Sequence, residues 1–148
     1  MAFGMPSSRY PSSMSEVLQP SITFRAATLE AVCRFGRSRP WNGDLAVRQA
    51  KFQVVHDELR LLYRKSTVLM FGVMDGGCSG GSYFSPRRDE IVLVGRLSVV
   101  TFLHEWAHVL HGPSEVAACR WSIQLFARSF PRQFERLTTD GHVLRLQA

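Results

Sequence analysis

The chain has 148 residues, of which 45% are hydrophobic and 20% are charged. This composition is typical of one globular domain and excludes a largely disordered protein. No apolar run approaches the roughly 18 residues of a membrane-spanning helix, so we expect no membrane segment. The net charge of +6 would suit an acidic partner such as nucleic acid, but the arginines are scattered, so this indication is weak.

The N-terminal residues 1–20 are rich in Ser, Pro and Met, and we expect them to be disordered. They lack the apolar stretch of a signal peptide, which favours a cytoplasmic protein. The three cysteines, at positions 33, 78 and 119, form no CxxC pair, which fits a reducing compartment. The prediction is therefore a disordered segment followed by a single domain over residues 21–148.

Two helices are predicted in the first half of that domain. The first covers residues 24–36 and ends at Gly36, before the turn SRPWNG. The second is the longest of the chain: Asp44 caps it, and it continues to residue 65. Its apolar positions follow the i, i+3/i+4, i+7 spacing of one helix face: Leu45, Phe52, Val55, Leu59, Leu62 and Tyr63.

Short strands and a glycine-rich loop are predicted next. The segment TVLMFGV, residues 67–73, is apolar and rich in β-branched residues, which predicts a buried strand. The loop DGGCSGGS, residues 75–82, lacks the GxxxxGK[ST] pattern of a phosphate-binding loop. Residues 82–86 and 90–95 are predicted to form two further strands around the polar turn PRRD.

Two more helices complete the domain. Ser98 is an N-cap for a helix over residues 99–111, which Gly112 and Pro113 terminate. Ser114 caps a second helix that Pro131 closes, and a further short helix is expected in the tail. This order of elements predicts an α+β fold with a small sheet.

The sequence HEWAH at residues 104–108 is an HExxH motif. At 3.6 residues per turn, His104 and His108 lie on one helix face, so both imidazoles can reach one zinc ion at roughly 2.0–2.1 Å. Glu105 is rotated about 100° from His104 and can reach a zinc-bound water without being a ligand. Zinc lowers the pKa of such a water toward about 7, and the glutamate can accept its proton. The motif predicts zinc-dependent peptide hydrolysis with Glu105 as general base.

A catalytic zinc needs a third protein ligand and an open coordination position. Glu115 is the first choice, because it begins the next helix and a tight turn brings that helix back against the first. His111 lies on the same face as His108 but about 10 Å along the axis from His104, which favours a supporting or capping role. Cys119 is a weaker candidate: a thiolate binds zinc well, but a small residue there suits helix packing.

The segment HEWAHVLHGPSEVAACRWSIQLFARSFP, residues 104–131, resembles the core of gluzincin metallopeptidases, and most closely the ImmA/IrrE family. In that family the HExxH helix is followed by a helix that begins Glu-x-x-Ala and continues with an aromatic residue, a leucine and a proline. The matching residues are Glu115, Ala118, Trp121, Leu125 and Pro131. The resemblance extends over about residues 44–131 and implies a small zincin-like fold.

The resemblance also implies a function. It indicates a zinc peptidase, a hydrolase of protein or peptide substrates, in which His104, His108 and Glu115 bind Zn²⁺ and Glu105 is the catalytic base. The strand near residues 82–85 precedes the HExxH helix, as expected for an edge strand that a substrate could extend. A peptidase also needs a donor for the oxyanion. Three residues are candidates for that role: Tyr83, Arg120 and His142.

A non-enzymatic protein is the alternative. A zinc-stabilised basic domain could bind nucleic acid or a protein partner, as the net charge suggests. Glu105 beside the first histidine argues for catalysis, because a purely structural zinc site prefers four closed ligands. An inhibitor or toxin built on the same fold is a third reading, which the sequence does not address.

Overall fold

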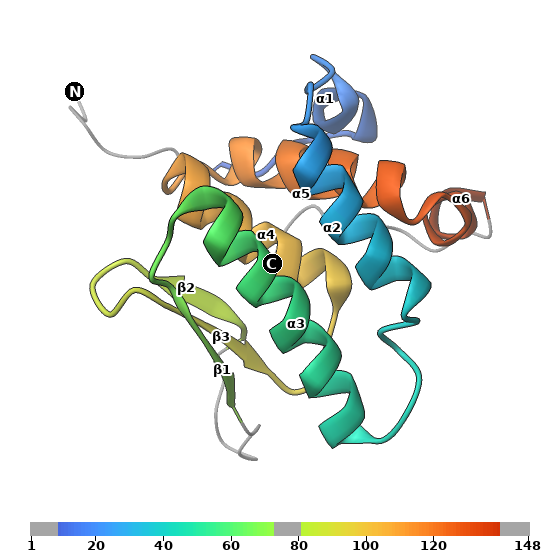
Figure 1. Ribbon diagram of the computed structural model, residues 1–148. Helices are drawn as coiled ribbons and strands as arrows, with labels where there is room; N and C mark the ends of the chain where they lie inside the picture. The colour runs from blue at the N-terminus through green and yellow to red at the C-terminus, as the bar shows by residue number, and fades with distance from the viewer. Residues whose placement is uncertain (1–8, 73–80, 140–148) are drawn as a thin grey trace.

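The computed structural model describes residues 9–72 and 81–139, and it has an α+β fold (Figure 1). In chain order, the elements are α1 (Met14–Leu18), α2 (Ala26–Arg37), α3 (Leu45–Tyr63), β1 (Val68–Gly72), β2 (Tyr83–Ser85), β3 (Glu90–Val94), α4 (Val99–His111), α5 (Glu115–Ser129) and α6 (Pro131–Thr139). Within these ranges, no helix is both long and apolar enough to cross a membrane.

The predicted helix starts are confirmed by their capping hydrogen bonds. Asp44 accepts a hydrogen bond from the Val47 N–H at 2.9 Å at the start of α3. The hydroxyl oxygens of Ser98 and Ser114 likewise accept N–H bonds from the third residue beyond them, at the starts of α4 and α5. Each cap satisfies an N–H that the first helical turn leaves unpaired. The start of α4, which carries the HExxH motif, and the start of α5 are thus defined by local sequence.

The three strands form one sheet in the order β1-β3-β2. β1 pairs with β3 in parallel, and β2 pairs with β3 antiparallel, so β2 is an edge strand. Its register places Phe84 opposite Ile91 and Tyr83 opposite Val92. Because paired residues share a face and successive residues alternate, Phe84 lies on the face of the buried Ile91, and Tyr83 lies on the other face.

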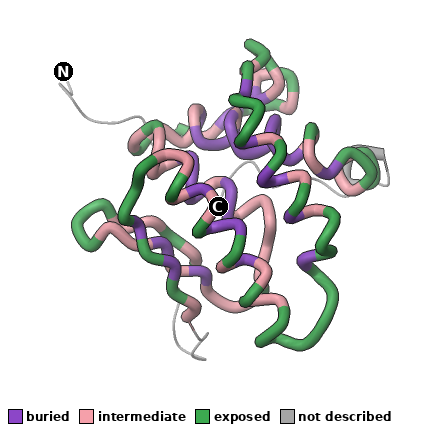
Figure 2. The backbone as a smooth tube through the Cα atoms, in the orientation of Figure 1, coloured by how far each residue is buried: buried purple, intermediate pink, exposed green. Residues whose placement is uncertain are grey.

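The hydrophobic core lies where α2, α3 and α5 pack against α4 and the inner face of the sheet. Figure 2 shows the buried positions on the inward sides of these helices. Aromatic rings dominate this core, and Phe52, Phe102 and Trp106 are completely buried. Phe52 and Phe102 meet edge to face, with ring centroids 5.5 Å apart. Trp106 and Trp121 are core residues, as expected from their helical positions.

Three details differ from the sequence-based expectations. Within the segment expected to be disordered, the structure has helix α1, in which Val17 is completely buried. β1 is not buried on both faces, because Val68 and Met70 lie on the outer face of the sheet and are about half exposed. Leu45, expected on the apolar face of α3, is also half exposed, since it stands in the first turn beyond the core.

Candidate metal centre

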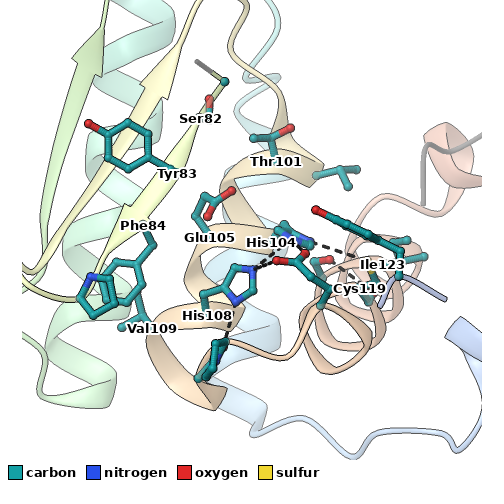
Figure 3. A pocket seen from close by; sticks show the side chains of 18 residues that line it. Ser82, Tyr83, Phe84, Thr101, His104, Glu105, His108, Val109, Cys119 and Ile123 are labelled. Carbon is teal, nitrogen blue, oxygen red and sulfur yellow. Dashed lines mark hydrogen bonds and ion pairs between the residues drawn. The ribbon is translucent and has the colours of Figure 1, made fainter. Parts of the chain in front are cut away.

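Side chains from α4 and α5 converge at one point. The Nε2 atom of His104 lies 2.9 Å from Oε2 of Glu115, and Nε2 of His108 lies 3.1 Å from Oε1 of the same carboxylate. The two Nε2 atoms are 3.2 Å apart. Figure 3 shows the two rings pointing toward one another from successive turns of α4. These three residues can together hold a metal ion, with potential ligand atoms all within 4.8 Å of one another.

The chain reverses direction between α4 and α5, and this turn places Glu115 beside the two histidines. Gly112 ends α4 with φ 84° and ψ −160°, a backbone conformation that is essentially restricted to glycine. Pro113 follows, and Ser114 caps α5 so that Glu115 stands in its first turn. The expected tight turn is therefore present, and it places the carboxylate against the HExxH face.

Hydrogen bonds fix the orientation of the two imidazoles. Nδ1–H of His108 donates to the Gly112 carbonyl oxygen at 2.9 Å, so the lone pair of that ring lies on Nε2. Nδ1 of His104 faces the Cys119 sulfur at 3.9 Å. Burial and the neighbouring His108 lower the pKa of His104, which favours the neutral imidazole that metals bind.

This arrangement brings hydrogen-bond acceptors together. Because Nδ1 of His108 holds the proton, its Nε2 lone pair faces a carboxylate oxygen of Glu115 at 3.1 Å. Two lone pairs at that distance repel unless a positive charge lies between them. A proton or a metal ion can supply this charge. His104 Nε2 lies at the same point, 2.9 Å from the carboxylate, so three groups that can each supply a ligand atom converge there, as a metal site requires.

The two rival ligands lie elsewhere. The His111 ring lies 5.9 Å from that of Trp121, and it is not part of the potential ligand group. The Cys119 sulfur is on the Nδ1 side of His104, away from the converging Nε2 atoms. Burial, and then the Glu115 charge, raise the pKa of Cys119 to about 12, so it is a thiol at neutral pH.

Glu105 lies beside the histidines and is nearly buried, with 7% exposure. In Figure 3 its carboxylate is between β2 and His104. Burial, and then repulsion by Glu115, raise the pKa of Glu105 to about 8, while the Phe84 backbone N–H acts in the opposite direction. Its contact with β2 rather than with the histidines fits a proton acceptor better than a ligand.

A cleft of about 960 Å³ opens over this group. Its walls come from β2, α4, the Gly112–Ser114 reversal and the start of α5, with Val100, Val109 and Ile123 among the apolar lining residues. Glu105 and Glu115 are the only acidic or basic residues other than histidine along the described part of the lining. The cleft is therefore open, largely apolar, and polar mainly at the convergent group.

Of the expected oxyanion donors that the structure describes, Tyr83 lines this cleft and Arg120 does not. Tyr83 lines its edge, but its ring extends away from the two histidines (Figure 3), as its register on β2 requires. The Arg120 guanidinium donates instead to the carbonyl oxygens of Glu16 and Gln19. His142 lies outside the described residues.

Tyr10 was not among the residues predicted to belong to the site. Tyr10 lines the cleft beside Glu115, and its hydroxyl can donate a hydrogen bond to that carboxylate. Burial, and then the Glu115 charge, raise the pKa of Tyr10, so the hydroxyl remains a donor at neutral pH. The Ser- and Pro-rich composition around Tyr10 gave no local signal of this contact with α5.

Comparisons of this chain with protein-family models, with curated proteins and with solved structures found no match.

Proposed function

We propose that this chain is a zinc-dependent peptidase of gluzincin type, similar to the ImmA/IrrE family and with a zincin-like fold. The observation that carries the proposal is the convergence of His104, His108 and Glu115 beside the nearly buried Glu105. Glu115 contacts both histidines, which supports the gluzincin assignment over a type with a third histidine.

The distances suit zinc. Tetrahedral ligands at about 2.0–2.1 Å from a common ion lie roughly 3.3 Å from each other. The two imidazole nitrogens are 3.2 Å apart, and each lies 2.9 or 3.1 Å from one of the two Glu115 oxygens, so the closest approaches are near that value. Two imidazoles and one carboxylate with an open position form the ligand set of catalytic rather than structural zinc. When bound, zinc would polarise the substrate carbonyl and make a water molecule acidic near neutral pH.

The protein residues then have separate tasks. His104, His108 and Glu115 hold the ion, and the Gly112 carbonyl keeps the His108 ring oriented. With the ion bound, its positive charge would favour the ionised form of Glu105, which could then accept a proton and pass it to the leaving amine. Its carboxylate is held by the Phe84 N–H, so β2 positions the base.

We expect the substrate to bind along the edge strand β2. The Phe84 N–H is directed to Glu105 and away from β3. The carbonyl of the same residue points to the same side, so it is the group that could accept a hydrogen bond from a substrate. An extended peptide could pair with this edge and cross the cleft above the histidines. Because the lining is largely apolar, we expect neutral, apolar side chains to be preferred near the cleaved bond.

A non-catalytic zinc-stabilised basic domain has less support. Among the described residues, the potential ligand group has three members, whereas a structural zinc site is usually closed by four. The nearly buried Glu105 at the same cleft would have no task in such a domain.

The test is cleavage of an undirected peptide library by the zinc-loaded protein, analysed by mass spectrometry. We expect zinc-dependent cleavage that falls by at least about 10²-fold in Glu105→Gln, with zinc still bound. Tyr83→Phe is the matched control at the edge of the cleft and on the outer face of the sheet. Zinc binding without cleavage of any peptide would reject the peptidase and leave only the metal site.

A further inference from the structure

The N-terminal segment, defined here as residues 9–22, crosses α5 and brings one polar side chain to the metal centre. Tyr10 lines the same cleft as Glu115, and its hydroxyl can donate a hydrogen bond to that carboxylate. Its ring packs against the small apolar cluster of Val17, Cys119 and Ile123. Tyr10 therefore approaches Glu115 from the N-terminal segment, whereas both histidines approach it from α4.

Gln124 of α5 anchors the second half of this segment. Its amide nitrogen donates to the carbonyl oxygens of Val17 at 2.8 Å and Pro20 at 3.1 Å. Its amide oxygen accepts the N–H of Ile22 at 2.8 Å. One nearly buried side chain thus satisfies three backbone groups about 100 residues away in sequence.

Glu16 fixes the first half of the segment, where Tyr10 lies. Its carboxylate accepts hydrogen bonds from the Ser12 N–H and hydroxyl, both at 2.9 Å, and pairs with Arg9 at 2.7 Å. The Glu16 carbonyl oxygen in turn accepts a hydrogen bond from Arg120 of α5 at 3.1 Å. Residues 9–12 are therefore tied to α1, and α1 is tied to the helix that carries Glu115.

We propose that Tyr10 is a positioning residue of the metal centre: its hydroxyl fixes the Glu115 carboxylate for metal binding, and the N-terminal segment holds it in place. This inference rests on the proposed function. A carboxylate ligand can rotate and change which lone pairs face the ion, and a hydrogen-bond donor on it restricts that rotation. The N-terminal segment is then a component of the site rather than an appendage.

The test compares the zinc affinities of wild type, Tyr10→Phe and Tyr83→Phe by competition with a chromophoric chelator at neutral pH. Tyr10→Phe removes only the hydroxyl, and we expect zinc affinity to fall by about 10- to 100-fold. Tyr83→Phe removes a hydroxyl on the outer face of the sheet and should leave affinity unchanged. The visible absorption band of the Co²⁺-loaded protein should change only in Tyr10→Phe.

A second variant tests the role of the segment without altering the cleft. Glu16→Gln weakens the contacts to Arg9 and Ser12, and it should lower zinc affinity by a smaller factor than Tyr10→Phe. In the double variant the two effects should not multiply, because both act through the same hydroxyl. Full multiplication would show that the segment acts by another route and would contradict the proposal. If Tyr10→Phe fails to fold, wild-type affinity in Glu16→Gln would still overturn it.

The outcomes separate this inference from the proposed function. If the wild-type protein binds no zinc, the metal centre itself is wrong. If wild type binds zinc and Tyr10→Phe binds it equally well with the same cobalt spectrum, only the role of Tyr10 is rejected. A loss of affinity in Tyr83→Phe as large as that in Tyr10→Phe would also reject it.

Discussion

Nδ1–H of His108 donates to the carbonyl oxygen of Gly112 at 2.9 Å, and this bond sets which nitrogen faces Glu115. The histidine belongs to the last turn of α4, and the glycine ends that helix. The same residue that permits the chain reversal therefore also fixes the tautomer of a potential ligand. Hydrogen bonds of this kind orient metal-binding imidazoles in proteins generally.

Gly112→Ala tests this double role. An added Cβ at Gly112 would meet no atom within 4 Å, so the cost arises from the backbone conformation alone. We expect a loss of about 1–3 kcal/mol in the free energy of unfolding. Zinc affinity should also fall, since a relaxed backbone would move the carbonyl from His108. Urea denaturation and chelator competition measure the two effects.

Gly81→Ala is the matched control for Gly112→Ala. Gly81 lines the same cleft, and its added Cβ would also meet open space, but it has no strained φ. Its stability and zinc affinity should remain close to wild type. Equal losses at the two glycines would contradict the role given to the Gly112 backbone.

Glu105 should make the metal-free protein less stable as the pH rises. Its pKa is about 8 in the fold, whereas an unfolded glutamate titrates near 4.3. Between these values the native carboxyl holds a proton that the unfolded chain has released, so stability falls with increasing pH, by up to about 1.4 kcal/mol per unit. Glu105→Gln should lose this component. Urea denaturation of both proteins with chelator present, from pH 5 to 8, measures the difference; parallel curves would contradict it.

His56 should have the opposite dependence. It is completely buried, its Nδ1 accepts the Trp106 indole N–H at 3.1 Å, and its Nε2 donates to the Thr67 carbonyl at 2.8 Å. Burial lowers its pKa, so below about pH 6.5 the unfolded chain binds a proton that the native state refuses. Wild type should therefore lose stability as the pH falls below that value.

His56→Gln removes the titrating imidazole, so it tests whether His56 causes the loss of stability at low pH. The variant should be less stable at neutral pH by about 1–3 kcal/mol, because a flexible amide of different shape replaces a buried ring that bonds both Trp106 and Thr67. Its denaturation midpoint should nevertheless depend less on pH between 5 and 7 than that of wild type. An unchanged pH dependence would show that His56 does not contribute to it.

The part of the site on α4 and α5 could be predicted because its geometry is local. The i, i+4 spacing places His104 and His108 on one helix face, and the Gly112-Pro113 reversal leaves few positions for Glu115. The N-caps Ser98 and Ser114 define both helices from neighbouring residues alone. Short-range rules therefore determine both the histidine pair and the turn after it.

The parts of the fold and site that the sequence did not predict depend on contacts between residues far apart in the chain. Tyr10 meets Glu115 because Gln124 and Arg120 bind a segment about 100 residues earlier, and its Ser- and Pro-rich sequence resembles that of disordered chains. From the sequence, His56 is one of several polar residues on α3. Its burial depends on tertiary packing against Trp106, from whose indole N–H it accepts a hydrogen bond. Composition and periodicity do not encode such pairings.

X-ray absorption at the zinc edge of the wild-type protein is the most direct test of the central claim that His104, His108 and Glu115 form a zinc centre. One zinc per chain should bind, with nitrogen and oxygen neighbours at about 2.0–2.1 Å and the signature of two imidazoles. Glu115→Gln should weaken binding and keep both imidazole signals. A sulfur neighbour at about 2.3 Å, which would make Cys119 a ligand, or the absence of bound zinc would contradict the account.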